Sequence, residues 1–482
     1  MMDDDAFLDD LAALLGPKGF SRDPEVLAPW LTDWRGRYHG AARALASPAT
    51  TDDVAAVVRL CARHGVPIVA QGGNTSMVGG ATPAPDGRAL LLSLRRMNRI
   101  RTLAADARIA VAEAGVILAS LHDAAAAAGL RFPLSLGARG SATVGGLVST
   151  NAGGTQVLRF GTMRALVLGL EAVLPDGQVF DALAPLPKDN RGPDLKQLLI
   201  GAEGTLGIVT AATLRLERQP AAVATAWAGL ADPAAALALL RRLEAQGLAV
   251  ESFELVPEDS LALVLEHIPG TRRPLAGAHR WHALIEASGG AEVGAALADA
   301  LAAALGDGLA ADIVMAGSLA QAAGFWRIRE SVSEAERASG PAVQHDISVP
   351  VAAMPQFMLD AAAAVERAFP GTRASAFGHL GDGNVHFHVR APAGADPARW
   401  LADCGAPISA FVYDQVVAAG GSISAEHGIG QMKLATFARL GDPARLAVLR
   451  AVKQALDPHG LMNPGKLVPP ESASLASGGN AP

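Results

Sequence analysis

The sequence has few of the features that mark secreted, membrane or nucleic-acid-binding proteins. Only two of its 482 residues are cysteines, Cys61 and Cys404, which excludes a disulfide framework and indicates a reducing compartment. No apolar run approaches the length of a membrane span, and the acidic start MMDDDAFLDDLAALLG lacks the positive region of a secretory signal. A net charge of -7 without an arginine–lysine block argues against nucleic acid as a partner. We therefore expect a cytoplasmic protein, either free or peripheral to the inner membrane.

The length indicates more than one domain. A chain of 482 residues exceeds what one hydrophobic core usually supports, and a composition that is 50% apolar and 18% charged is typical of soluble globular proteins. Near residue 220 glycine-rich loops give way to alanine-rich helical stretches without a fixed repeat period. We expect a first domain over 1–220, a second domain over 221–420, a C-terminal segment over 421–470 and a disordered tail over 471–482.

Local patterns predict both helices and strands. Thr50 and Asp53 form a capping pattern before an apolar helical face, and Gly65 ends that helix. Strands are predicted over 66–70, 89–94, 107–114, 250–256 and 282–288, with two more around a Pro-Asp-Gly turn within 165–180. Helices are predicted over 117–129, 231–248, 291–306 and 355–368.

Three glycine-rich stretches lie within the first 220 residues: QGGNTSMVGG (71–80), FPLSLGARGSATVGGLVSTNAGG (132–154) and the start of LIGAEGTLGIVTAATLRLERQP (199–220). Glycine lets the backbone pass close to a ligand, and successive N–H groups in such turns hold phosphate oxygens. None of the three is a G-x-G-x-x-G fingerprint or carries a Walker A lysine, which argues against a nicotinamide Rossmann site. One such loop alone is commonly a tight surface turn, whereas three indicate a large phosphate-bearing cofactor.

Histidines cluster in the stretch GHLGDGNVHFHV (378–389), which holds three of the twelve in the chain. Alternation at its end predicts a strand that points His386 and His388 to the same face. The glycine-containing turn before this strand can fold His379 back toward His386. A single histidine on a strand is more often a hydrogen-bonded core residue. The cluster therefore indicates a metal site only if further ligands lie elsewhere in the chain.

A distant stretch, SAEHGIG, supplies Glu426 and His427. Two imidazoles and one carboxylate, from His379, His386 and Glu426, form a three-ligand set that leaves metal positions open. Zinc suits this set, with iron and manganese as alternatives. His388 is open to three roles: a fourth ligand, a substrate contact or a residue that supports a ligand.

The motifs PIVAQGGNTSMVGG, GSATVGGLVSTNAGG, GAEGTLGIVT, GHLGDGNVHFHV, SISAEHGIGQMK and NPGK occur in the order typical of one family. Over residues 40–468 the chain resembles the FAD-dependent 2-hydroxy acid dehydrogenases of the vanillyl-alcohol-oxidase-like flavoproteins. These include D-lactate and D-2-hydroxyglutarate dehydrogenases and the glycolate oxidase FAD subunit. The resemblance implies an α+β fold, with a two-part PCMH-type FAD-binding domain over 1–220. It also implies a sheet-and-helix cap domain for the substrate over 221–420 and a C-terminal segment that returns to the flavin.

The same resemblance assigns the cofactor contacts. They come from all three glycine-rich stretches and from the NPGK motif: Gly72, Gly73, Asn74, Thr75, Ser76, Pro133, Gly140, Ser141, Thr143, Gly146, Asn151, Gly153, Glu203, Gly204, Ile208 and Asn463. The first stretch has no histidine or cysteine to attach a flavin, and His39 is the only histidine shortly before it. We therefore expect FAD to be bound non-covalently.

The resemblance also implies a reaction. Relatives hold a divalent metal with the trio that matches His379, His386 and Glu426. Oxidation of a 2-hydroxy acid sends the Cα hydrogen to flavin N5 as hydride and the hydroxyl proton to a base. A neighbouring metal lowers the pKa of a histidine, and His427 is the expected base. Arg329 matches the arginine that binds the substrate carboxylate.

Further expected substrate contacts flank these catalytic groups. Ser333 lies one turn beyond Arg329 if FWRIRESVSE is one helix, whereas Arg327 is interpreted as a surface arginine. Relatives that act on D-2-hydroxyglutarate carry lysine at the position of Gln344 and asparagine at the position of His388. Loss of that lysine leaves D-lactate and D-2-hydroxyglutarate both open as substrate types, since His388 and His345 can replace part of its charge.

Two other functions compete with this one. A flavin-independent metallohydrolase would use Glu426 and His427 with metal-bound water, but it leaves the glycine loops unexplained. An FAD-binding subunit of a larger oxidase complex would not need the catalytic residues. For the dehydrogenase, a quinone, an electron-transfer flavoprotein or another carrier each suits as electron acceptor. A homodimer is compatible with the sequence, which does not define the oligomeric state.

Overall fold

The structure of the chain is a computed structural model that describes residues 2–470. The expected disordered tail over 471–482 lies outside the described residues. None of the helices within residues 2–470 is both long and apolar enough to cross a membrane.

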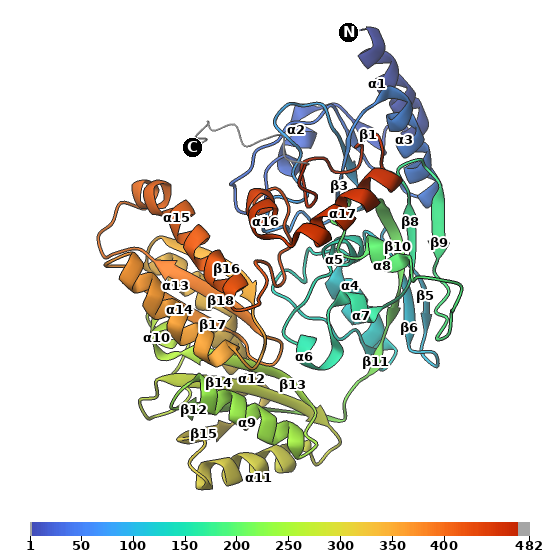
Figure 1. Ribbon diagram of the computed structural model, residues 1–482. Helices are drawn as coiled ribbons and strands as arrows, with labels where there is room; N and C mark the ends of the chain where they lie inside the picture. Colours follow the sequence, from blue (N-terminus) through green and yellow to red (C-terminus); the bar gives the residue numbers. More distant parts are fainter. Residues whose placement is uncertain (1, 471–482) are drawn as a thin grey trace. The chain divides into compact units, whose positions relative to one another are not determined.

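The chain folds into two compact units (Figure 1). Among the described residues, the first unit contains 2–154, 161–219 and 426–470, and the second contains 155–160 and 220–425. The domain boundaries expected from the sequence lie at residues 220 and 420. The short segment 155–160 was expected in the first domain, whereas in the structure it packs within the second unit.

The first unit begins with a small mixed sheet. Its strands lie in the order β1 (Phe20–Ser21), β2 (Leu45–Ala46), β4 (Leu90–Ser93) and β3 (Ile68–Gln71). β4 runs parallel to both β2 and β3. Helices α1 (Met2–Leu15) and α3 (Thr51–His64) pack on this sheet through a core that includes Phe7, Val57 and Leu92.

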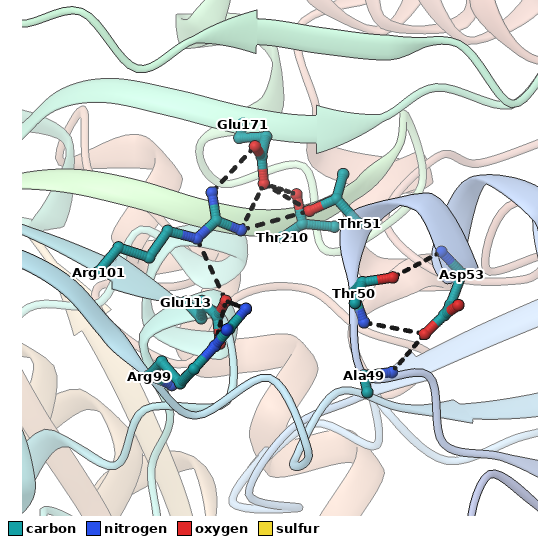
Figure 2. Close-up of polar contacts among 9 residues, drawn as sticks. All are labelled: Ala49, Thr50, Thr51, Asp53, Arg99, Arg101, Glu113, Glu171 and Thr210. Atoms are coloured by element: carbon teal, nitrogen blue, oxygen red, sulfur yellow. Dashed lines mark hydrogen bonds and ion pairs between the residues drawn. The ribbon is translucent and has the colours of Figure 1, made fainter.

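α3 confirms the capping pattern that the sequence predicted. Thr50 Oγ1 accepts a hydrogen bond from the Asp53 N–H, and the Asp53 carboxylate accepts from the Thr50 N–H (Figure 2). Gly65 ends the helix in the left-handed conformation, with φ of 61°. The predicted apolar face, Val54, Val57, Val58 and Cys61, is fully buried.

A five-stranded antiparallel sheet forms the second layer of the first unit. Its strands, in spatial order, are β5 (Ile100–Ala104), β6 (Ile109–Glu113), β10 (Ile208–Arg215), β8 (Val167–Val173) and β9 (Val179–Ala182). The shorter elements are α2 (Pro24–Leu27), η1 (Ala28–Trp30), α4 (Leu118–Ala127), β7 (Leu130–Arg131), α5 (Val144–Thr150), α7 (Met163–Leu166), α8 (Lys196–Leu199) and β11 (Glu217–Arg218).

Two carboxylates tie this sheet to α3 (Figure 2). The Arg101 guanidinium donates to Glu113 Oε1 at 3.2 Å and to both oxygens of Glu171 at 3.0 Å. Glu171 also accepts from the hydroxyls of Thr51 at 2.6 Å and Thr210 at 2.8 Å. Because Thr51 begins α3 and Thr210 lies on β10, the network fixes the helix against the sheet from which the third glycine-rich stretch emerges.

The C-terminal segment returns to the first unit, where Figure 1 shows α16 (Leu434–Leu440) and α17 (Pro443–Leu456) in red. After α17 the backbone bridges to β3, with the Ile68 N–H donating to Leu461 O and the Asn463 N–H to Ile68 O, both at 2.8 Å. This pairing places Asn463 beside the strand that leads into the first glycine-rich stretch.

One seven-stranded antiparallel sheet forms the second unit. Its strands, in spatial order, are β15 (Asp312–Met315), β12 (Ala222–Leu230), β14 (Trp281–Gly289), β13 (Val250–Pro257), β17 (Arg373–His379), β18 (Asn384–Arg390) and β16 (Ala342–Ser348). Four helices cover one face: α9 (Pro233–Ala245), α11 (Val293–Gly306), α14 (Met354–Ala368) and α15 (Pro397–Ala418). Three pack on the other: α10 (Glu258–His267), α12 (Leu319–Glu330) and α13 (Val332–Ser339).

The helices α12 and α13 are held by an apolar cluster. Phe325, Ile328 and Val332 pack against sheet residues that include Trp227 and Phe377, and all five are buried. Ile328 directly precedes Arg329, and Phe377 lies two residues before His379 on the same strand, so this cluster fixes the backbone from which Arg329 and His379 extend. The short helix α6 (Val157–Phe160) also belongs to this unit and packs on β13.

Candidate active site

A cavity of about 600 Å³ lies within the first unit. Its lining includes these expected cofactor residues: Gly72, Gly73, Asn74, Thr75, Ser76, Ser141, Thr143, Gly146, Gly153, Glu203, Gly204 and Ile208. Glu426 and His427 line the same cavity. All three glycine-rich stretches and the SAEHGIG loop therefore converge on one space.

Two glycine-rich stretches pack with almost no room between their backbones. A Cβ atom at Gly72 would lie 2.2 Å from Thr143 Oγ1, and one at Gly73 would lie 2.0 Å from Ser141 O. Only glycine permits this approach. Asn74, with φ of 55°, then turns the chain along the cavity and donates from Nδ2 to Thr32 O at 2.9 Å.

Buried polar atoms at this cavity have no partner among the described residues. They include the hydroxyl oxygen of Thr143, which is 2% exposed, and Oε1 of Gln71, which is 1% exposed. The side-chain oxygen of Asn463, whose amide is bonded to two lining residues, is 3% exposed and likewise has no partner in the described part of the chain. A buried oxygen without a donor is costly, so these atoms suit a ligand that brings N–H or O–H groups. A flavin dinucleotide has both kinds of donor, and the residues present therefore fit FAD.

Glu203 connects the third glycine-rich stretch to the SAEHGIG loop. Its carboxylate oxygens accept from the N–H groups of Ile429 and Gly430, each at 2.7 Å. Burial raises the pKa of Glu203, whereas these two N–H groups act in the opposite direction. Its own carbonyl oxygen accepts from Asn463 Nδ2 at 2.7 Å. The residue therefore holds two segments of the C-terminal region at the cavity.

Four expected cofactor residues are not part of the cavity lining: Pro133, Gly140, Asn151 and Asn463. Asn463 is nevertheless bonded to two lining residues, since its Nδ2 donates to the carbonyl oxygens of Gly80 and Glu203. Asn151 ends α5 with φ of 50°, and its Oδ1 accepts from the Arg164 N–H at 2.8 Å. The structure gives Asn151 a role in turning the chain.

In the second unit, β17 and β18 bring His379 and His386 together. The ring centroids lie 5.4 Å apart, and the ligand nitrogen atoms lie within 4.8 Å. Burial and the positive charge of Arg329 hold the pKa of His386 well below its ordinary value. A neutral imidazole is the form that binds a metal, so His386 fits a position in a metal site, with His379 beside it. The third expected ligand, Glu426, belongs to the first unit.

Glu254 of β13 joins His379 to Arg329. Its Oε1 accepts from His379 Nδ1 at 2.6 Å, and its Oε2 accepts from Arg329 Nε at 2.7 Å. Burial opposes ionisation of Glu254, but His379 and Arg329 outweigh it and lower the pKa of this carboxyl. Arg329 Nη2 is buried without a hydrogen-bond partner among the described residues. The guanidinium therefore retains N–H groups that suit a substrate carboxylate.

The expected contacts to the substrate tail lie on neighbouring strands. Gln344 on β16 pairs in register with His388 on β18. His388 Nδ1 donates to the carboxylate of Glu336 on α13, and both residues are buried. Ser333 lies on the same helix and is half-buried, but α12 ends at Glu330 and α13 begins at Val332. The single continuous helix on which the placement of Ser333 depended is thus interrupted.

Arg327 and His345 lie away from these expected substrate contacts. Arg327 donates to Pro269 O at 2.8 Å at an exposed site, as expected for a surface arginine. His345 is bonded to Phe387 O at 2.9 Å and to Ser409 Oγ at 3.1 Å. Alternation along β16 points His345 to the face opposite Gln344. The expectation that His345 helps to replace the missing lysine is therefore wrong.

Sequence reasoning missed the two acidic partners, Glu254 and Glu336. Both are fully buried, and each holds a residue that was expected to act in the site. A signal was present for Glu254, because VESFELV places two glutamates, Glu251 and Glu254, among the apolar residues of a predicted strand. The pairing of Glu254 with His379 could not be predicted from the sequence, since the two residues are 125 positions apart.

Comparison with known proteins identifies relatives of both units. A family described as "FAD binding domain" matches residues 42–182, and one described as "FAD linked oxidases, C-terminal domain" matches residues 219–467. D-2-hydroxyglutarate dehydrogenase of Xanthomonas citri pv. viticola is 37% identical over 447 residues, which cover 92% of this chain and 93% of the relative. The mitochondrial enzymes of that name from Arabidopsis thaliana and Bos taurus are each 36% identical, over 95% and 96% of this chain and 80% and 84% of their own lengths.

Solved structures show the same fold at lower sequence identity. p-Cresol methylhydroxylase has a TM-score of 0.74 at 17% identity, with 97% of each chain covered. Alkyldihydroxyacetonephosphate synthase has a TM-score of 0.72 at 16% identity and covers 95% of this chain and 84% of its own. These similarities confirm the expected α+β fold with its PCMH-type FAD-binding domain.

Proposed function

Because the chain belongs to the family of FAD-linked oxidases that includes the D-2-hydroxyglutarate dehydrogenases, we propose that it oxidises a D-2-hydroxy acid to the 2-oxo acid. The observation that carries this function is the convergence of three glycine-rich stretches and His427 on one cavity. The family assignment removes the flavin-independent metallohydrolase as an alternative, since the chain is an FAD-dependent 2-hydroxy acid dehydrogenase.

Bound FAD supplies a two-electron acceptor for the hydrogen that leaves the substrate Cα. The close packing of Gly72 against the Thr143 side chain and the unpartnered oxygen of Asn463 support its position in the cavity. We propose that it is held non-covalently, because the stretch over 71–80 contains neither histidine nor cysteine. Acid treatment should then release all the flavin into the supernatant, and flavin that precipitates with the chain would contradict the proposal.

His427 is the proposed base. It lines the cavity, and Glu203 fixes its loop through the backbone N–H groups of Ile429 and Gly430. A neutral imidazole there accepts the hydroxyl proton while hydride leaves Cα, so that no charge accumulates on the substrate oxygen. Proton acceptance by His427 and binding of the carboxylate by Arg329 are the steps that this chain's own residues perform.

We propose that His379, His386 and Glu426 hold a divalent metal, with zinc the best match to the ligand types. Such an ion supplies Lewis acidity toward the substrate hydroxyl and carboxylate oxygens. The proximity of the two imidazoles and the bond from His379 Nδ1 to Glu254 support the assignment, because metal-binding histidines commonly donate their other N–H to a carboxylate. His386→Ala should lower both metal content and turnover with FAD retained; full metal occupancy in that variant would contradict the assignment.

The substrate tail is proposed to meet Gln344, His388 and Ser333. Gln344 is neutral, and His388 is held by a buried carboxylate, so the pair offers less positive charge than a lysine would. A short uncharged tail, as in D-lactate, therefore suits this region at least as well as the second carboxylate of D-2-hydroxyglutarate.

The test is a screen of D- and L-2-hydroxy acids with a redox dye as acceptor, with and without added zinc. Oxidation confined to D-enantiomers supports the proposal, and turnover of L-enantiomers alone would exclude it. The natural acceptor is proposed to be a quinone, an electron-transfer flavoprotein or another carrier, and the dye stands in for it. A cytoplasmic location, free or peripheral to the inner membrane, is proposed from the low cysteine content, although the Arabidopsis and bovine relatives carry mitochondrial names.

A further inference from the structure

Glu254 differs from the other buried carboxylates of the second unit in the identity of its partners. It is 0% exposed, and its two oxygens bind two residues that have separate roles in the proposed reaction. One partner is His379, a proposed metal ligand, and the other is Arg329, the proposed carboxylate-binding residue. The sheet register explains the first contact, because Glu254 and His379 are directly paired between β13 and β17.

The hydrogen bonds define how each partner is oriented. Carboxylate oxygens accept and never donate, so the hydrogen of His379 lies on Nδ1, and the lone pair of that ring lies on Nε2. Metal ions bind the nitrogen that carries the lone pair. On the other side, the bond to Nε fixes the plane of the Arg329 guanidinium, which also lies over the ring of Phe377 at 5.1 Å. Within the described residues, Arg329 Nη2 is buried and makes no hydrogen bond.

We propose that Glu254 is a positioning residue that sets the metal-binding tautomer of His379 and the orientation of Arg329 at the same time. The inference rests on the proposed function, since that function assigns His379 to the metal and Arg329 to the substrate. In this proposal Glu254 itself contacts neither the hydroxyl nor the carboxylate of the substrate. It acts through its two partners, and a single carboxylate thereby couples metal binding to carboxylate binding.

The chain offers a matched control on the same strand. Glu251 is 1% exposed and is also paired with an arginine, since Arg159 Nη1 donates to its Oε1 at 2.8 Å. Ser288 and Gln156 also donate to its carboxylate, and neither is expected in the site. A Glu251→Gln variant therefore disturbs a buried ion pair of the same kind without touching a metal ligand.

The decisive variant is Glu254→Gln, purified with FAD and examined without substrate. Arg329 is always a charged donor, so the glutamine oxygen turns toward it and the glutamine NH₂ group faces His379. His379 must then accept at Nδ1 and carry its hydrogen on Nε2, where it no longer binds metal. Zinc affinity, measured by competition with a chromophoric chelator, is expected to fall about 10–100-fold with flavin content unchanged. Glu251→Gln is expected to keep the zinc affinity of the wild type.

Two outcomes overturn the inference. One is a zinc affinity of Glu254→Gln within about threefold of the wild type, well short of the loss that removal of such a partner causes. The other is an equal loss in Glu251→Gln, which would make the effect one of general stability. If Glu254→Gln does not fold, Glu254→Asp decides, because it keeps the charge but shortens the reach. Its zinc affinity should fall, and an unchanged value in a folded protein contradicts the inference.

Failure of the proposed function gives a different result. A wild-type protein that binds zinc but oxidises no D-2-hydroxy acid would exclude the proposed reaction while the zinc measurements on Glu254→Gln remain decisive. A wild-type protein with no zinc affinity would overturn the role of Glu254, whatever its turnover.

Discussion

Buried histidines in this chain differ in what their two ring nitrogens contact. His345 is held at both nitrogens, by Phe387 O and Ser409 Oγ, and His282 lies between Trp227 Nε1 and the Glu258 carboxylate. Both nitrogens of these two residues are already occupied by structural contacts. His379 instead directs one nitrogen to a carboxylate, and its ring lies 5.4 Å from the ring of His386. The surroundings, more than the residue type, distinguish the structural histidines from the proposed metal ligand.

At the residue scale, His427→Ala should lower kcat by about 10²–10⁴-fold, the range for loss of a general base. FAD and zinc content should be unchanged, because neither is assigned to His427. His459→Ala is the control, since His459 is an exposed histidine in the same C-terminal segment. Retention of more than about a fifth of the wild-type kcat, with chemistry rate-limiting, would show that another group takes the proton.

A second prediction at this scale concerns Gln344, the register neighbour of His388. A charged hydrogen bond is worth about 1.5–3 kcal/mol against about 1 kcal/mol for a neutral one. Gln344→Lys should therefore shift the ratio of kcat/KM values toward D-2-hydroxyglutarate over D-lactate by roughly tenfold. Steady-state kinetics with both substrates measure this ratio. No change in it would mean that position 344 does not face the substrate tail.

At the scale of elements, loops are held by contacts with residues that are distant in the sequence. The SAEHGIG loop is tied to Glu203 by two backbone N–H groups, and Gly428 within it has φ of 81°. A Cβ atom at Gly428 would lie 2.7 Å from Glu203 Oε1. The loop that carries Glu426 and His427 is therefore shaped by a side chain from another glycine-rich stretch.

Gly428→Ala should displace this loop and lower kcat, with added loss of stability. The left-handed conformation costs a non-glycine residue about 1–2 kcal/mol. Gly460→Ala isolates that backbone cost, because Gly460 has φ of 64° and a Cβ atom there would have no described atom within 4 Å. Both substitutions should lower the Tm of thermal unfolding, but only Gly428→Ala should lower kcat. Equal kcat values in the two variants would contradict this role of the loop.

The cap of α3 gives a prediction of stability alone. Thr50→Ala removes the bond to the Asp53 N–H and should lower the free energy of unfolding by about 1 kcal/mol. Thr162 is the matched control, since within the described residues it begins α7 without a side-chain bond to the helix. Denaturant unfolding of both alanine variants measures the difference. A loss at Thr162 as large as that at Thr50 would show that the capping bonds contribute nothing.

The elements that could be predicted are those whose signals are local. The cap at Thr50, the left-handed Gly65 and the alternation of β18 depend on neighbours within a few residues, and the structure confirms each of them. The break between α12 and α13 at Ser331 could not be predicted, because FWRIRESVSE carries neither glycine nor proline. Glu254 and Glu336 were missed since their partners are set by strand register and helix packing over long sequence distances.

At the scale of the whole molecule, the chain passes from one unit to the other four times, so neither unit is a continuous stretch of sequence. Composition indicated the change near residue 220. The segment 155–160 instead contacts β13 through bonds such as the ion pair between Arg159 and Glu251, which no local pattern reveals. The cavity and His427 belong to the first unit, whereas Arg329 and the two histidines that are proposed as metal ligands belong to the second. The proposed reaction requires residues of both.

The most direct test of this account is anaerobic reduction of the bound flavin by substrate. The holoenzyme is mixed without oxygen or dye with D-lactate, D-2-hydroxyglutarate and the L-enantiomer of each, and the visible flavin absorbance is followed. We predict bleaching by a D-2-hydroxy acid and none by its L-enantiomer, with bleaching slowed in His427→Ala. Flavin that stays oxidised with every D-2-hydroxy acid, or that the L-enantiomers alone reduce, would contradict the central claim.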